Sequence, residues 1–305
     1  MKRNLFVGLA VTAAIVAAAG CSTDNQSAST TTSVSATAMP SQSQSAPAPS
    51  HPVTYSPQVE LPFGDSINHL AGVAVDTTSN VYVLDLYYGQ VWMQAPGASH
   101  LTKLPFTELG RPVDVAVDAE GNLYVVDNFE NRVLKLAPET TNPTVLPFTD
   151  IRPGSVAVDA AGDVYVTDYY NNRVLMLAAG ASSPIDLPFN DTRPDGVAVD
   201  AVGNVYVNDF HAKRVLKLAA GTSSPTVLQF NDLDIPSDVE VDAAGNVYVT
   251  DLGTNRVLKL AAGASSSTVL PFNDLDNPSD VAVDTAASVY ILDGGHFRVL
   301  KLPAQ

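Results

Sequence analysis

Residues 155–168 read Ser-Val-Ala-Val-Asp-Ala-Ala-Gly-Asp-Val-Tyr-Val-Thr-Asp, and this stretch decides the fold because it recurs along the chain. Two short apolar runs flank a polar turn, which Asp opens and in which Gly takes the left-handed backbone conformation. The first Asp recurs at steps of 41 or 42 residues, and a second Asp follows nine residues later. The two sets are Asp76, Asp118, Asp159, Asp200, Asp242 and Asp284, and Asp85, Asp127, Asp168, Asp209, Asp251 and Asp293.

Each copy of the repeat predicts four short strands. In the third copy they cover residues 155–158, 164–167, 173–177 and 185–189. The fourth strand contains the recurring Leu-Pro-Phe, and proline within a sheet is typical of an edge strand, so we expect this strand to be outermost. A unit of about 40 residues with four antiparallel strands, present in six copies, predicts an all-β protein, a six-bladed β-propeller.

The two ends of the chain predict how the ring closes. The sixth copy ends at Gln305 just after its third strand, whereas residues 59–63, Val-Glu-Leu-Pro-Phe, precede the first copy and match residues 144–148. We therefore expect the strand at 59–63 to complete blade six and to close the ring.

Composition excludes several classes of partner. An apolar share of 46% in 305 residues suffices for a core, and 16 Lys and Arg stand against 32 Asp and Glu. Removal of Lys2 and Arg3 with a signal peptide takes the formal net charge from -16 to -18, which disfavours nucleic acid and anionic membrane surfaces as partners. A single cysteine excludes an internal disulfide framework and a zinc site built on cysteines.

The N-terminal segment has the features of a secretory signal. Residues 1–20 combine a basic start with an apolar run, Leu5 to Ala19, that is shorter than the ~20 residues needed to span a bilayer. Small residues directly before Cys21 resemble the lipobox of bacterial lipoproteins, which implies lipid attachment at Cys21; an ordinary cleaved signal is the alternative. Residues 21–56, rich in Ser, Thr, Ala and Pro, predict a disordered tether before a propeller at 57–305. We expect the propeller to be anchored at the outer face of the cytoplasmic membrane.

The repeat resembles a known family, the NHL repeat. The resemblance rests on the run Asp-Xaa-Xaa-Gly-Asn-Val-Tyr-Val-Thr-Asp followed by Asn-Arg-Val-Leu-Lys-Leu, as seen at Asp242 to Leu260. With Leu-Pro-Phe, Arg-Pro and Lys-Leu-Ala-Ala-Gly, residues 57–305 are similar to the extracellular sensor domain of mycobacterial receptor Ser/Thr kinases of the protein kinase D type. The resemblance implies a six-bladed propeller that binds a ligand outside the cell. The given sequence contains no Gly-rich phosphate loop, His-Arg-Asp or Asp-Phe-Gly, so the resemblance does not imply kinase activity.

The repeated aspartates are interpreted as structural. The first set opens hairpin turns, where a carboxylate accepts backbone N–H groups. The second set precedes a loop that ends in an arginine, which is a natural charge partner, at Arg132, Arg173, Arg214, Arg256 and Arg298. Blade one has Gln90 at that position, so we expect Asp85 to lack its partner.

Candidate binding residues lie where the copies differ. In a propeller, the loops from strand four to strand one and from strand two to strand three emerge on one face. Aromatic rings from blades one to four, arginines and inner-strand acids there suit a peptide, a glycan or another protein. The candidates are Tyr87, Tyr88, Phe129, Tyr169, Tyr170, Phe210, His211, Arg111, Arg152, Arg193, Asp114, Asp238 and Asp280. In the alternative interpretation the rings pack as local core and the arginines pair with Asp150 and Asp191.

The functional prediction is a monomeric, non-enzymatic sensor or scaffold module without cofactor or metal, whose partner is an envelope protein, peptide or glycan. The alternative is a metal-dependent hydrolase or lyase at the channel mouth, with zinc bound by His69, His211 and His296 or calcium bound by the three candidate aspartates. Glu240 replaces an alanine of the repeat, and it either meets a basic neighbour or reaches the channel.

Overall fold

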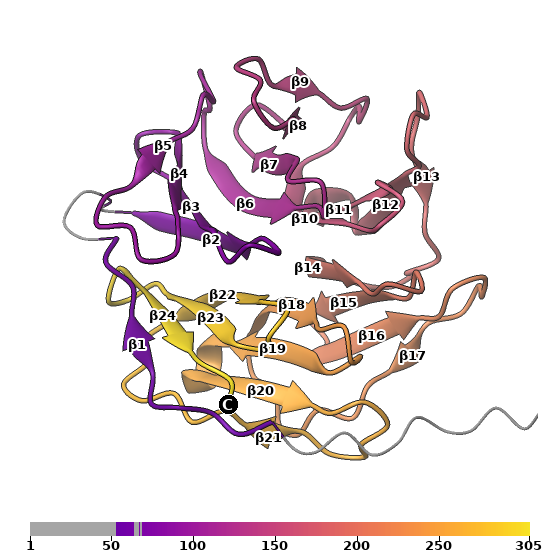
Figure 1. The fold of residues 1–305 in the computed structure, drawn as a ribbon. Coiled ribbons are helices and arrows are strands. Elements are labelled where there is room, and N and C mark those ends of the chain that lie inside the picture. Colours follow the sequence, from indigo (N-terminus) through magenta and orange to yellow (C-terminus); the bar gives the residue numbers. More distant parts are fainter. Residues whose placement is uncertain (1–52, 64–66, 68) are drawn as a thin grey trace, which may run out of the picture. The chain divides into compact units, whose positions relative to one another are not determined.

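The repeated stretch forms the inner part of a four-stranded antiparallel sheet in each of six blades (Figure 1). The computed structural model describes residues 53–63, 67 and 69–305. The predicted signal peptide, Cys21 and the tether up to residue 52 lie outside the described residues. No helix in the described ranges is long and apolar enough to cross a membrane.

The six sheets run from an inner to an outer strand. Blade one contains β2 (Leu70–Val75), β3 (Val81–Asp85), β4 (Gln90–Gln94) and β5 (Thr102–Lys103). Blade two contains β6 (Pro112–Val117), β7 (Leu123–Asp127), β8 (Arg132–Leu136) and β9 (Thr144–Val145). Blade three contains β10 (Pro153–Val158), β11 (Val164–Asp168), β12 (Arg173–Leu177) and β13 (Ile185–Asp186).

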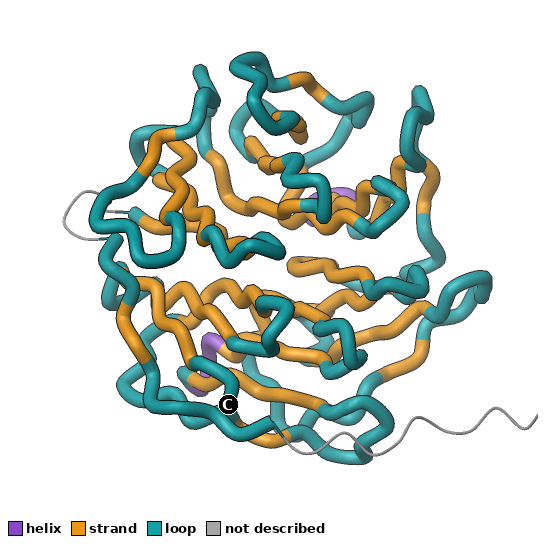
Figure 2. The backbone as a smooth tube through the Cα atoms, in the orientation of Figure 1, coloured by secondary structure: helices purple, strands orange, loops and turns teal. Residues whose placement is uncertain are grey.

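The second half of the ring repeats this order. Blade four contains β14 (Pro194–Val199), β15 (Val205–Asp209), β16 (Arg214–Leu218) and β17 (Thr226–Val227). Blade five contains β18 (Pro236–Val241), β19 (Val247–Asp251), β20 (Arg256–Leu260) and β21 (Thr268–Val269). Blade six contains β22 (Pro278–Val283), β23 (Val289–Asp293), β24 (Arg298–Leu302) and, as its outer strand, β1 (Val59–Glu60). Figure 2 shows strands and connecting loops throughout, with short 3-10 helices at η2 (Tyr169–Asn171) and η3 (Leu252–Thr254).

The core lies between the blades. The second strand of every blade, such as β11, is buried at all five positions because each sheet packs against a neighbour on both faces. This explains its continuous apolar sequence in place of strict alternation. Six clusters of buried side chains fill the interfaces between successive blades, including the interface between blade six and blade one.

The first set of aspartates closes the inner hairpins. In blade three, Asp159 Oδ1 accepts the N–H groups of Ala161 and Asp163 at 2.9 Å, and the Tyr165 hydroxyl donates to Asp159 Oδ2 at 3.1 Å. Gly162 has φ 82°, as the turn predicts. Blades one and six place Ser79 and Ala287 at the equivalent position, with φ 65° and 64°. These two turns carry backbone strain that glycine avoids.

The outer strand is shorter than the sequence predicts. In blade three it covers Ile185–Asp186, and only Leu187 continues the pairing, by donating to the Val174 carbonyl at 2.8 Å. The Phe189 N–H then donates to the Leu187 carbonyl at 2.8 Å, which forms a γ-turn around Pro188. Proline therefore ends the strand and directs Phe189, which is 2% exposed, into the interface between blades.

The predicted ring closure is confirmed. β1 pairs antiparallel with β24, with Val59 opposite Lys301, and the Leu61 N–H donates to the Val299 carbonyl at 2.9 Å. The pairing begins before residue 57, because Tyr55 forms a bridge with Ala304. Phe63 is buried in the cluster that joins blade six to blade one.

Deletion of residues 57–63 is expected to lower the melting temperature by about 10 °C or more, because it removes a strand and a buried phenylalanine from this interface. Circular dichroism of the deletion variant and of the intact chain measures the change. An unchanged melting temperature would contradict the role of β1 in closure.

Candidate functional site

The second set of aspartates holds the loops of the variable face. In blade three, Asp168 Oδ2 accepts from Arg173 Nε at 2.9 Å, and Asp168 Oδ1 accepts the Arg152 backbone N–H at 2.9 Å. One carboxylate therefore joins two strands to the loop that precedes the inner strand. Blades two, four, five and six repeat the ion pair with Asp127 and Arg132, Asp209 and Arg214, Asp251 and Arg256, and Asp293 and Arg298.

Five of the candidate residues surround one pocket on this face. Arg111 of blade two, Arg152, Tyr169 and Tyr170 of blade three and Phe210 of blade four line a cavity of about 390 Å³. The Arg152 guanidinium lies over the Tyr170 ring, 4.4 Å from its centroid, and the two tyrosine rings meet edge to face at 6.0 Å. The pocket thus combines cationic groups with aromatic surface.

The arginines of this face do not form the ion pairs with Asp150 and Asp191 that the alternative interpretation predicts. In the part of the chain that the structure describes, Arg111, Arg152 and Arg193 are exposed and form no ion pair, either with Asp150 and Asp191 or with other acids. Their guanidinium groups remain available to a ligand.

Several of the aromatic rings are too exposed for a local core, whereas Tyr169 and Phe210 are 38% and 36% exposed and are partly packed. Tyr87 and Phe129 are each 71% exposed and Tyr170 is 66% exposed. Several candidates nevertheless lie outside the pocket lining, namely Tyr87, Tyr88, Phe129, His211 and Arg193. Tyr87 and Tyr88 belong instead to blade one, where their ring centroids are 5.1 Å apart.

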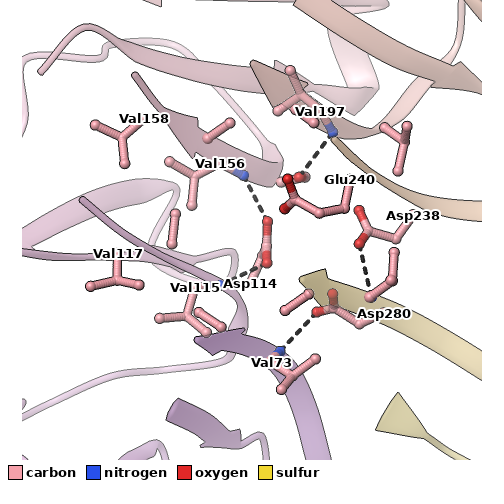
Figure 3. A pocket seen from close by; sticks show the side chains of 18 of the residues that line it. Val73, Asp114, Val115, Val117, Val156, Val158, Val197, Asp238, Glu240 and Asp280 are labelled. Carbon is pink, nitrogen blue, oxygen red and sulfur yellow. Dashed lines mark hydrogen bonds between the residues drawn. The ribbon is translucent and has the colours of Figure 1, made fainter. Parts of the chain in front are cut away.

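The three candidate aspartates line the central channel (Figure 3). Asp114 Oδ2 accepts the Val156 N–H at 2.7 Å, Asp238 Oδ2 accepts the Val281 N–H at 3.1 Å, and Asp280 Oδ2 accepts the Val73 N–H at 3.0 Å. Each acceptor belongs to one blade and each donor to the inner strand of the next. The donors follow the register shift of that strand, where the regular ladder is interrupted. The aspartates therefore link neighbouring blades.

Burial in the channel raises the pKa of Asp114, Asp238 and Asp280 above the ordinary aspartate range, and the neighbouring carboxylates add to this effect for Asp238 and Asp280. Glu240 also lines the channel, and its Oε1 accepts the Val241 N–H at 2.8 Å. Burial raises the pKa of Glu240 to about 8. Among the described residues no basic side chain lines the channel, so Glu240 reaches the channel rather than a basic partner.

The histidines of the metal alternative have separate surroundings. His69 stacks on Tyr87 with ring centroids 5.5 Å apart, His296 Nδ1 lies 2.9 Å from Asp293 Oδ2, and His211 is exposed. Within residues 53–63, 67 and 69–305, no group of three or more His, Cys, Asp or Glu side chains is arranged to hold a metal ion.

Two polar residues of the pocket were not among the sequence candidates. Asp195 lines both the pocket and the channel mouth, and burial raises its pKa to about 6. Asn128 also lines the pocket, and its amide donates to the Pro153 carbonyl at 2.8 Å, which connects blade two to blade three. The sequence could have identified Asp195 as a candidate, because it is the one acidic residue at its repeat position. The other copies have Ala71, Val113, Gly154, Ser237 and Ser279 there.

Comparisons with known proteins agree with this fold. The NHL repeat model matches residues 151–175, within the third copy, and curated protein sequences yield no match. The fold is similar to streptogramin B lyase, with 13% identity, a TM-score of 0.63 and coverage of 81% of this chain and 97% of that chain. It is also similar to a gluconolactonase of Xanthomonas campestris, with 15% identity, a TM-score of 0.65 and coverage of 79% and 88%.

A chain of a nidogen/laminin complex is similar as well, at 21% identity and a TM-score of 0.63, with coverage of 70% of this chain and 84% of that chain. These similarities extend to enzymes and to a binding protein, and at such identity they establish the fold alone. The chain is thus a six-bladed β-propeller with an NHL repeat.

The variant Glu240→Gln is expected to be more stable than the wild type at pH 8, by about 1–3 kcal/mol, and to be nearly equal to it at pH 5. The folded pKa of Glu240 is about 8 against 4.5 for the free side chain, so the folded state retains a proton that the unfolded state releases as pH rises through this window. Rising pH therefore destabilises the wild type but not the variant at this residue. Urea unfolding at both pH values measures the difference.

The matched control is Glu120→Gln, which removes the same charge from an exposed turn residue. It is expected to leave the pH dependence of stability unchanged. Equal pH slopes for wild type and Glu240→Gln would show that Glu240 is not buried as described.

Proposed function

We propose that the protein is a lipid-anchored binding module on the outer side of a bacterial membrane, and that it takes a protein or peptide ligand of the envelope in the pocket of blades two to four. The observation that supports this proposal is the convergence of Arg111, Arg152, Tyr169, Tyr170 and Phe210 around one cavity. Arginine and tyrosine are enriched among the residues that dominate protein interfaces.

The chemistry of the pocket favours a ligand with a carboxylate next to an apolar group. An arginine without an internal partner offers a forked pair of donors to a carboxylate. The tyrosine and phenylalanine rings supply apolar contact at little cost in conformational entropy, because each ring has only two rotatable bonds. A glycan that stacks on the rings is the competing ligand.

The proposed location rests on the sequence features of residues 1–56, and the resemblance of residues 57–305 to extracellular kinase sensor domains supports a ligand outside the cell. With a lipid at Cys21, residues 22–52 would form a tether between the membrane and the propeller. The strong negative charge disfavours nucleic acid as a partner. We expect the module to act as a monomer.

A metal-dependent hydrolase or lyase remains the second candidate, since similar folds are found in a lyase and a gluconolactonase. Against it, no group of three or more His, Cys, Asp or Glu side chains among the described residues is arranged to hold a metal ion, and at least one oxygen of each of Asp114, Asp238 and Asp280 already accepts a backbone N–H. Elemental analysis of the purified protein distinguishes the two functions. Stoichiometric zinc or calcium, lost in Asp238→Asn, would favour the enzyme.

The combined replacement of Tyr169, Tyr170 and Phe210 by alanine is expected to abolish capture of the ligand from envelope extract and to lower the melting temperature by about 5 °C, so that the variant stays folded in the assay. Tyr169 and Phe210 are 38% and 36% exposed, so their replacement also removes some packed surface. Pull-down followed by mass spectrometry measures capture. Proteinase treatment of the extract separates a protein ligand from a glycan.

The control is Val202→Ser, which removes an exposed apolar side chain from the hairpin turn of blade four and lies outside the pocket. It is expected to retain full capture. Retention of capture by the triple variant would remove the pocket from the binding site.

A further inference from the structure

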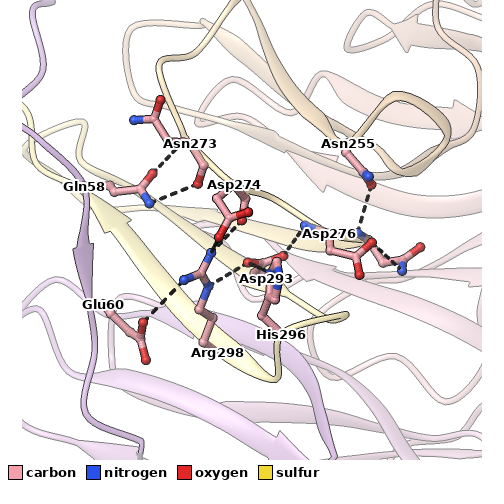
Figure 4. A network of polar contacts seen from close by, with 10 residues as sticks. Gln58, Glu60, Asn255, Asn273, Asp274, Asp276, Asp293, His296 and Arg298 are labelled. Carbon is pink, nitrogen blue, oxygen red and sulfur yellow. Dashed lines mark hydrogen bonds and ion pairs between the residues drawn. The ribbon is translucent and has the colours of Figure 1, made fainter.

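Blade one departs from the ion pair that the other blades share. In blades two to six the Oδ2 atom of a buried aspartate accepts from an arginine Nε at 2.7–3.3 Å. The arginine side chains keep 19–33% of their surface exposed, so the guanidinium position lies within reach of solvent. Blade six shows the arrangement: Arg298 contacts Asp293 and also donates to the Asp274 carbonyl at 2.6 Å (Figure 4).

In blade one, Gln90 replaces the arginine and Asp85 remains buried at 1% exposure. Asp85 Oδ1 accepts the N–H groups of Tyr87 and Tyr88, both at 3.0 Å. Asp85 Oδ2 is buried and has no hydrogen-bond partner among the described residues. A buried carboxylate oxygen without a donor is unusual in a folded protein and calls for a ligand or another physical cause.

Exposed aromatic rings surround the loop that follows Asp85. Tyr87 contacts His69 by stacking and Tyr88 by an edge-to-face contact, and His69 meets Phe297 of blade six at 5.9 Å. Tyr87, Tyr88 and Phe297 are each more than half exposed. The loop held by Asp85 therefore carries exposed aromatic rings of the kind that, together with a carboxylate, bind organic cations, because ring faces and carboxylates both attract positive charge.

We propose that blade one binds an alkylguanidinium group, such as an arginine side chain of a partner protein, which donates to Asp85 Oδ2 and takes the place that the repeat's own arginine occupies in the other blades. The aromatic cluster of His69, Tyr87, Tyr88 and Phe297 covers the alkyl chain and the guanidinium face. This site is separate from the pocket of blades two to four. The formal net charge of -16 attracts a cationic partner at long range.

Gln90 stands where the other blades have the arginine, and its side chain is partly exposed. It forms no hydrogen bond with Asp85 Oδ2. The strand itself is held by regular pairing, with Gln90 opposite Asp85 and Trp92 opposite Val83. Since side chains alternate along strands, Trp92 lies on the same face of the sheet as Asp85 and is the one tryptophan of the chain. Its fluorescence can therefore report on the site.

The test titrates N-acetyl-arginine methylamide into the full chain and follows Trp92 fluorescence and the melting temperature. Wild type is expected to bind saturably with a dissociation constant on the order of millimolar, as for one charged contact with aromatic packing. Gln90→Arg supplies the missing guanidinium internally, so it is expected to weaken binding at least tenfold and to raise the melting temperature. Asp85→Asn is expected to weaken binding at least tenfold while the protein stays folded.

Two controls make the result specific. Thr102→Arg adds the same charge to the exposed outer strand of blade one and is expected to leave binding unchanged. N-acetyl-lysine methylamide, a point charge without the forked donors, is expected to bind more weakly than the arginine probe. The proposal is overturned if the wild type does not saturate below about 100 mM, or if Gln90→Arg binds the probe as well as the wild type does.

Discussion

The buried aspartate that ends the second strand of each blade is the interaction on which the variable face depends. In blades two to six its carboxylate accepts a hydrogen bond from an arginine of the third strand and another from a backbone N–H of the preceding loop. Removing the arginine of such a pair leaves a buried carboxylate uncompensated, which is far more costly than losing a surface ion pair. The loops that carry ligand candidates are therefore held by the same contact in blade after blade.

Most of the fold could be predicted because a propeller is built from local units whose pattern recurs. Steps of 41 or 42 residues set the number of blades, and the match between residues 59–63 and 144–148 predicted the closing strand. The outer strands were overestimated because Leu-Pro-Phe combines a strand-like apolar pattern with a turn, and the position of Pro188 within a γ-turn depends on backbone hydrogen bonds that no composition reveals. Ordered pairing at Tyr55 was missed because Tyr55 lies at the end of a segment whose Ser-, Thr- and Pro-rich composition predicts a disordered tether.

The candidate site was predictable in part. Variation between copies identified Arg152 and Tyr170 as candidates in two loops on the same face. In the structure the two side chains form a cation–π contact. The same reasoning placed Asp114, Asp238 and Asp280 beside the channel, and they line both the channel and its mouth. What the sequence did not show is that each of them also accepts a backbone N–H of the next blade. Their backbone acceptor role arises from a register shift in the inner strand, and sequence patterns do not show which N–H groups leave the ladder. By contrast, the sequence alone predicted that Asp85 lacks an arginine partner, because Gln90 occupies the arginine position of the repeat.

The most direct test of this account is the free energy of unfolding, measured with urea, of six single variants. In each variant the buried aspartate that ends the second strand of one blade is replaced by asparagine. The account predicts losses of about 1–3 kcal/mol for Asp127, Asp168, Asp209, Asp251 and Asp293, where a partly exposed arginine loses its charge-assisted hydrogen bond. It predicts a neutral or stabilising effect for Asp85→Asn, because that carboxylate has no donor at Oδ2 within the described residues. A loss at Asp85 equal to that in the other five blades would contradict the account.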